Sequence, residues 1–378
     1  MNEKLNNNRN LGIEALRVIS MFMVIFLHIL NHGIDYPKLE PFSFNWFLGW
    51  FIEALCYCAV NIYAMISGYV MVNSKPKLSR LIILWLEVLF YSGVSEIILQ
   101  ILTPNTMWGV KDIVKAMLPV CSQQFWYFTA YFAMFWFIPL FNWIIHNLEF
   151  RNVRYLIYLL LTIFGFFPWI AEIFGTTAFG VSGGYTALWL AVLYLVGAGI
   201  RVYGFSLLSL RKREHSVNWF FNVALLSGGG IFLSKLILTG LTVKILGREF
   251  GTAQFYSYLS PLVVLEAIVL LCFFSRLKIE KGIFWIRVGK LTFGIYLVHQ
   301  TKLFGYYVWP MFKDYIGANP VPFLLVIIIG GILIFCGSGA IEYIRSKLFQ
   351  VCKIEKFSNI IATKVEAIIT KIVVFKEE

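Results

Sequence analysis

The sequence predicts an all-α fold: a polytopic membrane helix bundle of about ten transmembrane helices, with the N- and C-termini cytoplasmic. Hydrophobic residues occupy 59% of the 378 positions, and charged residues occupy only 14%. A soluble domain usually has about a quarter of its residues charged. Apolar runs such as Leu156–Phe167 do not alternate polar and apolar residues, so a closed membrane barrel is excluded.

Ten segments have the length and hydropathy of a spanning helix, and each is bounded by proline, glycine or charge. They cover residues 12–32, 45–72, 79–102, 124–147, 152–173, 185–204, 217–245, 255–275, 283–311 and 321–348. Hydropathy is uniform from end to end, so we expect one membrane domain, 12–348. A cytoplasmic N-terminal segment, 1–11, precedes it. This segment is polar and the run after it is long enough to span, which predicts that no signal peptide is cleaved.

Lysine and arginine are distributed unevenly between the loops. If the N-terminus is cytoplasmic, the loops on the opposite side contain only seven of the 32 basic residues: Lys38, Lys111, Lys115, Lys244, Arg248, Lys302 and Lys313. The positive-inside rule then places both termini in the cytoplasm. The basic residues responsible for the net charge of +12 lie in the loops between apolar spans. We therefore expect them to contact anionic lipid of the plasma membrane and not nucleic acid.

The tail, residues 349–378, is basic and amphipathic. Its apolar residues recur at near-helical spacing: Ile360, Ile361, Val365, Ile368 and Ile369. This pattern predicts a helix lying on the cytoplasmic leaflet, and a helix that binds a partner is the alternative.

The sequence has no Walker A loop, HExxH pair or dinucleotide fingerprint. The six cysteines form no CxxC pair or Cys/His cluster, so neither a disulfide framework nor a metal site is expected.

The first span has an unusual set of ionisable residues, which are costly in a membrane and therefore candidates for function. Arg17 and His28 are eleven positions apart, which places them on one helix face about 16 Å from each other along the axis. Glu14 lies one turn before Arg17 on the same side. A guanidinium suits a phosphate, and an imidazole can accept a proton from a hydroxyl. The structural alternative is an interfacial Glu14–Arg17 ion pair with His28 as a core residue.

An ordered set of motifs over about residues 10–345 resembles the acyltransferase-3 family of integral membrane acyltransferases. The set begins with Glu14-Ala-Leu-Arg17 and His28, an arginine and a histidine separated by ten residues. It continues with Ile66-Ser67-Gly68-Tyr69-Val70, Arg80, Gln124-Phe125-Trp126-Tyr127-Phe128, Tyr258-Leu259-Ser260-Pro261 and Leu291-Thr292-Phe293-Gly294-Ile295-Tyr296-Leu297-Val298-His299. One departure is that family members often have a second arginine and a proline after the basic cluster, where this chain has Arg80-Leu-Ile-Ile-Leu-Trp85.

The resemblance implies transfer of an acetyl or another short acyl group from cytoplasmic acyl-CoA to a hydroxyl of an envelope or exported polysaccharide. The expected partners are the acyl-CoA donor, the glycan acceptor and membrane lipid, with a homo-oligomer or glycan-assembly partners left open. The loops and the tail resemble those of Gram-positive members. The implied site has His28 as catalytic base and Glu14 as a second catalytic residue, with Arg17 and Arg80 binding acetyl-CoA and no metal. Trp126, Tyr127 and Ser67 would contact the substrate.

Several of these residues also have a structural explanation. Trp126 and Tyr127 fit interface anchors, and Ser67 could hydrogen-bond locally beside a turn at Gly68. His299 is expected at the outer interface. Lys235 and Glu266, both within spans, could pair with each other or with other charges.

Two functions from other classes remain open at this stage. A secondary transporter or exporter of a lipid-linked glycan would also have about ten spans with buried charges, although no paired repeats are evident. A membrane sensor module without chemistry is the third hypothesis. Substrate flux in vesicles without acyl-CoA would distinguish the transporter.

Overall fold

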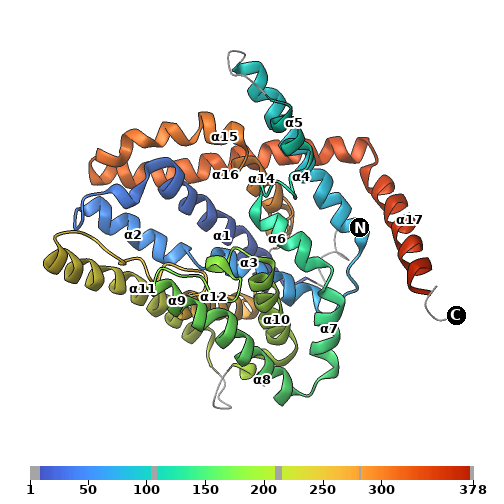
Figure 1. The fold of residues 1–378 in the computed structure, drawn as a ribbon, viewed down its shortest axis with the longest axis horizontal. Coiled ribbons are helices and arrows are strands. Elements are labelled where there is room, and N and C mark those ends of the chain that lie inside the picture. Colours follow the sequence, from blue (N-terminus) through green and yellow to red (C-terminus); the bar gives the residue numbers. More distant parts are fainter. Residues whose placement is uncertain (1–8, 104–108, 209–214, 281, 375–378) are drawn as a thin grey trace.

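The computed structural model describes residues 9–103, 109–208, 215–280 and 282–374, with side chains described to residue 369. The first eight residues of the expected N-terminal segment and the last four of the tail lie outside the described residues. Within the described ranges every regular element is helical (Figure 1). The α-helices are α1 (Leu11–His28), α2 (Phe44–Cys56), α3 (Ala59–Met71), α4 (Leu78–Leu102), α5 (Val110–Met117), α6 (Trp126–Phe135), α7 (Ile138–Asn147), α8 (Phe150–Leu161), α9 (Phe167–Ile173), α10 (Ala187–Tyr203), α11 (Val217–Leu246), α12 (Pro261–Arg276), α13 (Ile283–Gly289), α14 (Thr292–His299), α15 (Lys302–Tyr307), α16 (Pro320–Val351) and α17 (Ile354–Val374).

The described chain contains fewer uninterrupted spans than the ten expected. Seven helical segments are long and apolar enough to cross a membrane, or eight if α6 and α7, which meet at a 58° bend, form one span. The protein is therefore a multi-pass, all-helical membrane protein. The count of ten is not confirmed, and the cytoplasmic placement of both termini stays a prediction.

The expected spans 255–275 and 283–311 differ most from the structure. α12 begins at Pro261 and has only 16 residues. The segment 283–311 is not one helix, because α13, α14 and α15 are short and are followed by the 3-10 helix η6 (Trp309–Gly317). Thr301 caps α15 by accepting a hydrogen bond from the amide of Phe304, and Pro310 lies at the start of η6. Caps and prolines divide the run although its hydropathy is continuous.

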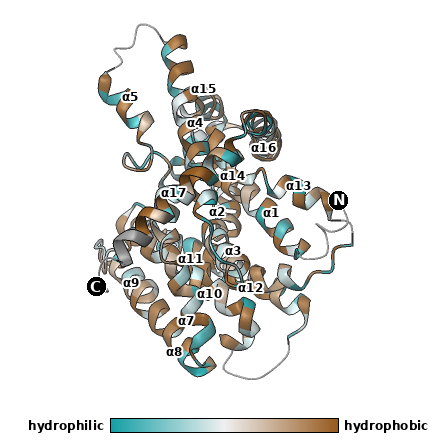
Figure 2. Ribbon diagram, turned by 90° about the vertical axis from the view of Figure 1, so that its right-hand side faces the viewer, coloured by the Kyte–Doolittle hydropathy of each residue, from teal (hydrophilic) through white to brown (hydrophobic). Residues whose placement is uncertain are grey.

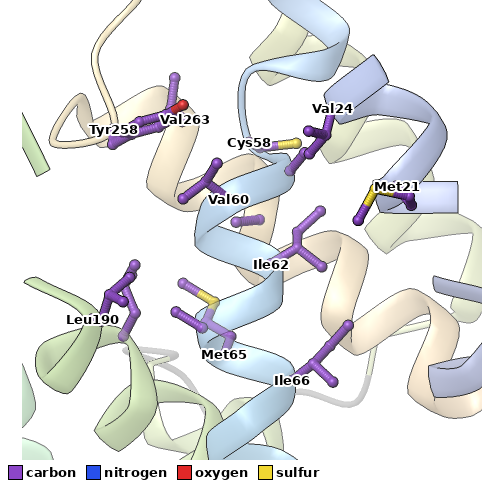
Figure 3. Packing of buried hydrophobic residues seen from close by; sticks show 14 of the residues in the cluster. Met21, Val24, Cys58, Val60, Ile62, Met65, Ile66, Leu190, Tyr258 and Val263 are labelled. Carbon is purple, nitrogen blue, oxygen red and sulfur yellow. The ribbon is translucent and has the colours of Figure 1, made fainter. Parts of the chain in front are cut away.

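The centre of the bundle is α3, which packs against α1 on one side and α10 on the other. Figure 3 shows Met21 and Val24 of α1 facing Ile62 of α3 and Cys58, the residue just before α3, with Leu190 of α10 on the opposite side. Glycine makes the α3–α10 crossing close. A Cβ added to Gly68 would lie 1.9 Å from the carbonyl oxygen of Tyr194, and one added to Gly197 would lie 2.0 Å from that of Met65. Small residues permit this backbone approach in membranes.

Replacing Gly68 or Gly197 by alanine is expected to destabilise the bundle by about 1–3 kcal/mol or more, because the added methyl group would meet backbone. The measurement is the melting temperature of the detergent-solubilised protein, determined by fluorescence-detected size-exclusion chromatography. Gly93→Ala on α4 is the matched control, since a Cβ there meets nothing within 4 Å. Equal melting temperatures of Gly68→Ala and Gly93→Ala would contradict the importance of the close α3–α10 crossing for stability.

A buried cation fixes the loop after α11. Lys235 is 1% exposed, and its ammonium donates to Glu249 at 2.7 Å and to Thr252 at 2.6 Å. The same ammonium lies 3.8 Å from the ring centroid of Trp50. Glu266, the other partner considered from sequence, is buried on α12 and interacts with Cys58 instead. The charge of Lys235 is therefore satisfied within the protein.

Hydrophobic residues, brown in Figure 2, predominate along most of the helices. Leu226 and Ile245 of α11 and Leu333 of α16 are 74%, 74% and 66% exposed, as expected for surfaces in contact with lipid. The tail helix α17 follows α16 (Figure 1) and contacts α4. Its Ser358 and Ala362 are buried, so one face is packed against the bundle, and its location on a leaflet stays a prediction.

Candidate active site

Two histidines that are distant in sequence meet inside the bundle. His28 ends α1, His299 ends α14, and His28 Nδ1 lies 3.0 Å from His299 Nε2. His299 is completely buried inside the bundle, and its position at the outer membrane interface stays a prediction. Its burial results from the break in the expected ninth span: α14 ends at His299 and the chain turns before α15, so this residue lies inside the bundle.

The hydrogen bonds determine which nitrogens carry protons. His299 Nδ1 lies 2.5 Å from the carbonyl oxygen of Ile295, and a carbonyl can only accept, so Nδ1 is protonated. In the neutral ring, His299 Nε2 is therefore an acceptor, and His28 Nδ1 must be the donor to it. The remaining nitrogen of His28, Nε2, then carries the unprotonated lone pair, with the Gln300 amide nitrogen 3.3 Å from it. This is the tautomer that a general base requires.

A polar cavity of about 350 Å³ lies next to His28 and is lined by His32, Gln300 and Trp309, among others. The His32 ring stacks on His28 with centroids 5.2 Å apart, and Trp309 lies 6.3 Å from His28. The Gln300 amide nitrogen is placed 2.8 Å from His28 Nδ1. The same amide nitrogen lies 3.3 Å from His28 Nε2, the unprotonated nitrogen to which it can donate. A hydroxyl-bearing molecule in this cavity would be adjacent to the base.

Basic residues gather at the opposite end of α1. The guanidinium of Arg17 is 21% exposed and pairs with Glu14 at 2.7 Å, and Arg9 pairs with the same carboxylate at 3.2 Å. Arg17 and Arg80 both lie near enough to Tyr131 for their charges to act on its hydroxyl. Glu14 lies about 21 Å along the axis from His28, because fourteen residues separate them. The structure thus groups Glu14 with Arg17 and not with the base.

Aromatic rings connect the two ends. Tyr296 lies 6.1 Å from His299, Tyr127 lies 6.2 Å from Tyr296, and Tyr63 lies 6.4 Å from Tyr127. The Tyr63 hydroxyl donates to the Arg17 carbonyl at 2.6 Å. Tyr127 therefore lies between the arginines and the histidines in this row of rings.

The other two residues expected to contact substrate lie elsewhere. Trp126 packs on Tyr185 and Tyr258, at centroid distances of 4.5 and 6.2 Å, to one side of the aromatic row. The Ser67 hydroxyl donates to the carbonyl of Tyr63 within α3 at 3.1 Å. That local bond matches the structural explanation of Ser67 considered from sequence.

Two residues of the site were missed by sequence reasoning. Gln300 follows His299 directly, and Trp309 lies beyond the break at Thr301. The only signal in the sequence was the polar pair His299-Gln300 at the end of an apolar run. The described residues contain no group of three ligand side chains placed to hold a metal ion, and the expectation of a metal-free reaction stays a prediction.

The fold and site define a multi-pass membrane protein with a buried, oriented imidazole at one end of a helix and a guanidinium near the other. Residues 10–343 match the family model described as an acyltransferase domain. The chain therefore belongs to the acyltransferase-3 family. No curated protein and no solved structure shows a significant match to it.

Proposed function

We propose that the protein is an O-acyltransferase of the plasma membrane. It moves an acetyl or another short acyl group from cytoplasmic acyl-CoA to a hydroxyl of an envelope or exported polysaccharide. The observation that carries the proposal is the His28–His299 hydrogen bond, which leaves His28 Nε2 as a base on the helix that also bears Arg17. Membership of the acyltransferase-3 family supports the reaction class.

The donor binds through its phosphates at the arginine end. A guanidinium forms bidentate hydrogen bonds to phosphate, and the charges of Arg17 and Arg80 both act on Tyr131. The pantetheine arm then extends past Tyr63 and Tyr127 toward the histidines. This placement puts the thioester carbonyl near His28 Nε2 and the acceptor in the polar cavity beside it.

In the direct reaction, His28 Nε2 removes the proton of the acceptor hydroxyl as its oxygen attacks the thioester carbonyl. The tetrahedral intermediate breaks its C–S bond, and the CoA thiolate takes the proton from Nε2. The products are an ester on the glycan and free CoA. The Nδ1–H group donates to His299 throughout, which keeps the ring oriented and disperses the positive charge of the imidazolium. An acyl-imidazole intermediate is the alternative course, since the same lone pair is a nucleophile.

The test compares base-labile acetate on the surface glycans of a strain lacking the gene with the same strain complemented by the wild-type gene. Restored acetate supports the proposal. Purified protein in proteoliposomes provides the second test, with labelled acetyl-CoA and a glycan extract. Failure to bind acyl-CoA and to transfer label to any extract would refute the reaction.

Removing the Arg17 guanidinium is expected to raise the KM for acyl-CoA about ten- to a hundredfold in Arg17→Ala, because charge-assisted hydrogen bonds to phosphate are lost. Arg17→Lys keeps the charge without the planar fork and should be intermediate. Arg151→Ala, at the exposed start of α8, is the control for loss of one charge. Initial rates over a range of acyl-CoA concentrations give the KM. An unchanged KM in Arg17→Ala would contradict donor binding at this residue.

A further inference from the structure

A cluster of four aromatic side chains lies beside the row of rings described above. Its central residue is Tyr185, whose ring centroid lies 4.5 Å from that of Trp126 and 5.1 Å from that of Tyr258. Tyr57 completes the cluster at 4.9 Å from Tyr258. Tyr185 is 49% exposed, and Trp126 and Tyr57 are partly exposed. This group, the Tyr185 cluster, therefore presents accessible ring surface and does not only fill the core.

The four rings come from places where helices begin or break. Tyr57 lies between α2 and α3, Trp126 begins α6, Tyr185 lies shortly before α10, and Tyr258 lies shortly before α12. α12 has 16 residues and ends at the exposed Arg276, so it is about 24 Å long and too short to cross the hydrocarbon core of about 30 Å. Irregular backbone at such depth is tolerated where it is buried in protein or faces water. The exposed ring of Tyr185 favours the second case.

Polar groups lie among these rings. The hydroxyls of Tyr57 and Tyr258 both interact with that of Tyr185. Glu53 and Glu172 lie near enough for their charges to act on the Tyr57 hydroxyl, and Glu172 is partly exposed. The cluster thus combines aromatic surface with hydroxyl donors and carboxylate acceptors.

Glu53 connects the Tyr185 cluster to the chain that follows the base. Its carboxylate accepts a hydrogen bond from Asn31 Nδ2 at 3.1 Å, and the same amide donates to a backbone carbonyl of α1. Asn31 is exposed and lies three residues after His28. The next residue, His32, lines the polar cavity. The cluster and the polar cavity therefore both adjoin η1 (Ile29–Ile34), the π-helix that directly follows α1.

We infer that the Tyr185 cluster is a saccharide-binding subsite for sugar units of the acceptor beyond the one that reacts, and that this part of the acceptor is uncharged. A sugar ring has an apolar face of C–H groups and a rim of hydroxyls, so aromatic rings and hydrogen-bonding groups can contact it together. Glu53 and Glu172 would repel a phosphate or a uronate at this position. The inference rests on the acyl transfer proposed above and specifies the charge and the minimum size of its acceptor.

Three variants test the subsite. Tyr185→Ala removes the exposed ring at the centre of the cluster, and Tyr185→Phe keeps the ring without its hydroxyl. Tyr155→Ala is the matched control, because Tyr155 is a tyrosine on α8 that is 68% exposed. The acceptors are fragments of the surface glycan obtained by partial hydrolysis, separated by size and by anion exchange.

Initial rates of transfer from labelled acetyl-CoA by the purified protein in detergent give the KM for each fragment. We expect the wild-type KM to fall as neutral fragments grow from one repeating unit to several, and acidic fragments to be poorer acceptors. Tyr185→Ala should raise the KM for the longer neutral fragments about three- to tenfold, as expected for the loss of one aromatic contact, and should abolish the dependence on length. Tyr185→Phe should keep most of that dependence, and Tyr155→Ala should behave as wild type.

A wild-type KM that does not depend on fragment length, or a dependence that persists in Tyr185→Ala, would overturn the inference while leaving the acyltransferase proposal standing. A preference for acidic fragments would also overturn it. Transfer to no fragment, together with no binding of acyl-CoA, would instead refute the proposed function. Binding of acyl-CoA by Tyr185→Ala with wild-type affinity shows that the variant is folded.

Discussion

Replacing His28 by alanine is expected to lower kcat about a thousandfold, because general base catalysis typically contributes about 10²–10⁴. The KM for acyl-CoA should change little, since the phosphates bind about 16 Å away at the arginine end. Steady-state transfer of labelled acetyl groups measures both constants, and binding of acyl-CoA to the variant confirms that the donor site is intact.

His215→Ala is the control for the His28 experiment. His215 stacks on Trp219 at a centroid distance of 3.9 Å, away from the site, and its replacement should leave kcat within about twofold of wild type. If His28→Ala retained wild-type transfer at matched expression, His28 would be excluded from the mechanism, and the His28–His299 pair would have only a structural role.

Replacing His299 by leucine is expected to lower kcat about a hundredfold with an unchanged KM for acyl-CoA. Leucine leaves His28 Nδ1–H without its acceptor, so the tautomer and the orientation of the base are no longer fixed. His299→Gln restores a side-chain acceptor and should recover part of the lost activity. His299 is a positioning residue, because it acts on the substrate through His28.

A purely structural role of His299 would give a different result. When His28 is already alanine, the further change His299→Leu should cost nothing more in kcat, since residues that act as a unit are non-additive. An additional loss in the double variant, or equal activity of the glutamine and leucine variants, would contradict positioning through the hydrogen bond.

The parts of the site that the sequence predicted are those set by a single helix. Arg17 and His28 share a face of α1 because helix geometry fixes their spacing, and the apolar runs predicted a helical membrane bundle. The meeting of His28 with His299 depends on long-range packing and on the break after α14, where Thr301 caps the next helix. Hydropathy does not record such a break.

Partners that lie on loops could not be inferred for the same reason. The sequence left the partner of Lys235 open, and the structure pairs it with Glu249, which is in the loop after α11. The fold of that loop depends on packing against α2, through the hydrogen bond from Trp46 to Glu249. No periodicity along the chain encodes this contact.

The continuity of α1 has a consequence for which donors the protein accepts. An uninterrupted helix from Leu11 to His28 holds Arg17, the proposed phosphate-binding residue, and His28, the proposed base, at one fixed separation. Selection would then act on the length of the donor between its phosphates and its reactive carbonyl, before the identity of the acyl group matters. A short activated donor such as acetyl phosphate could reach Arg17 or His28, but it could not reach both at once.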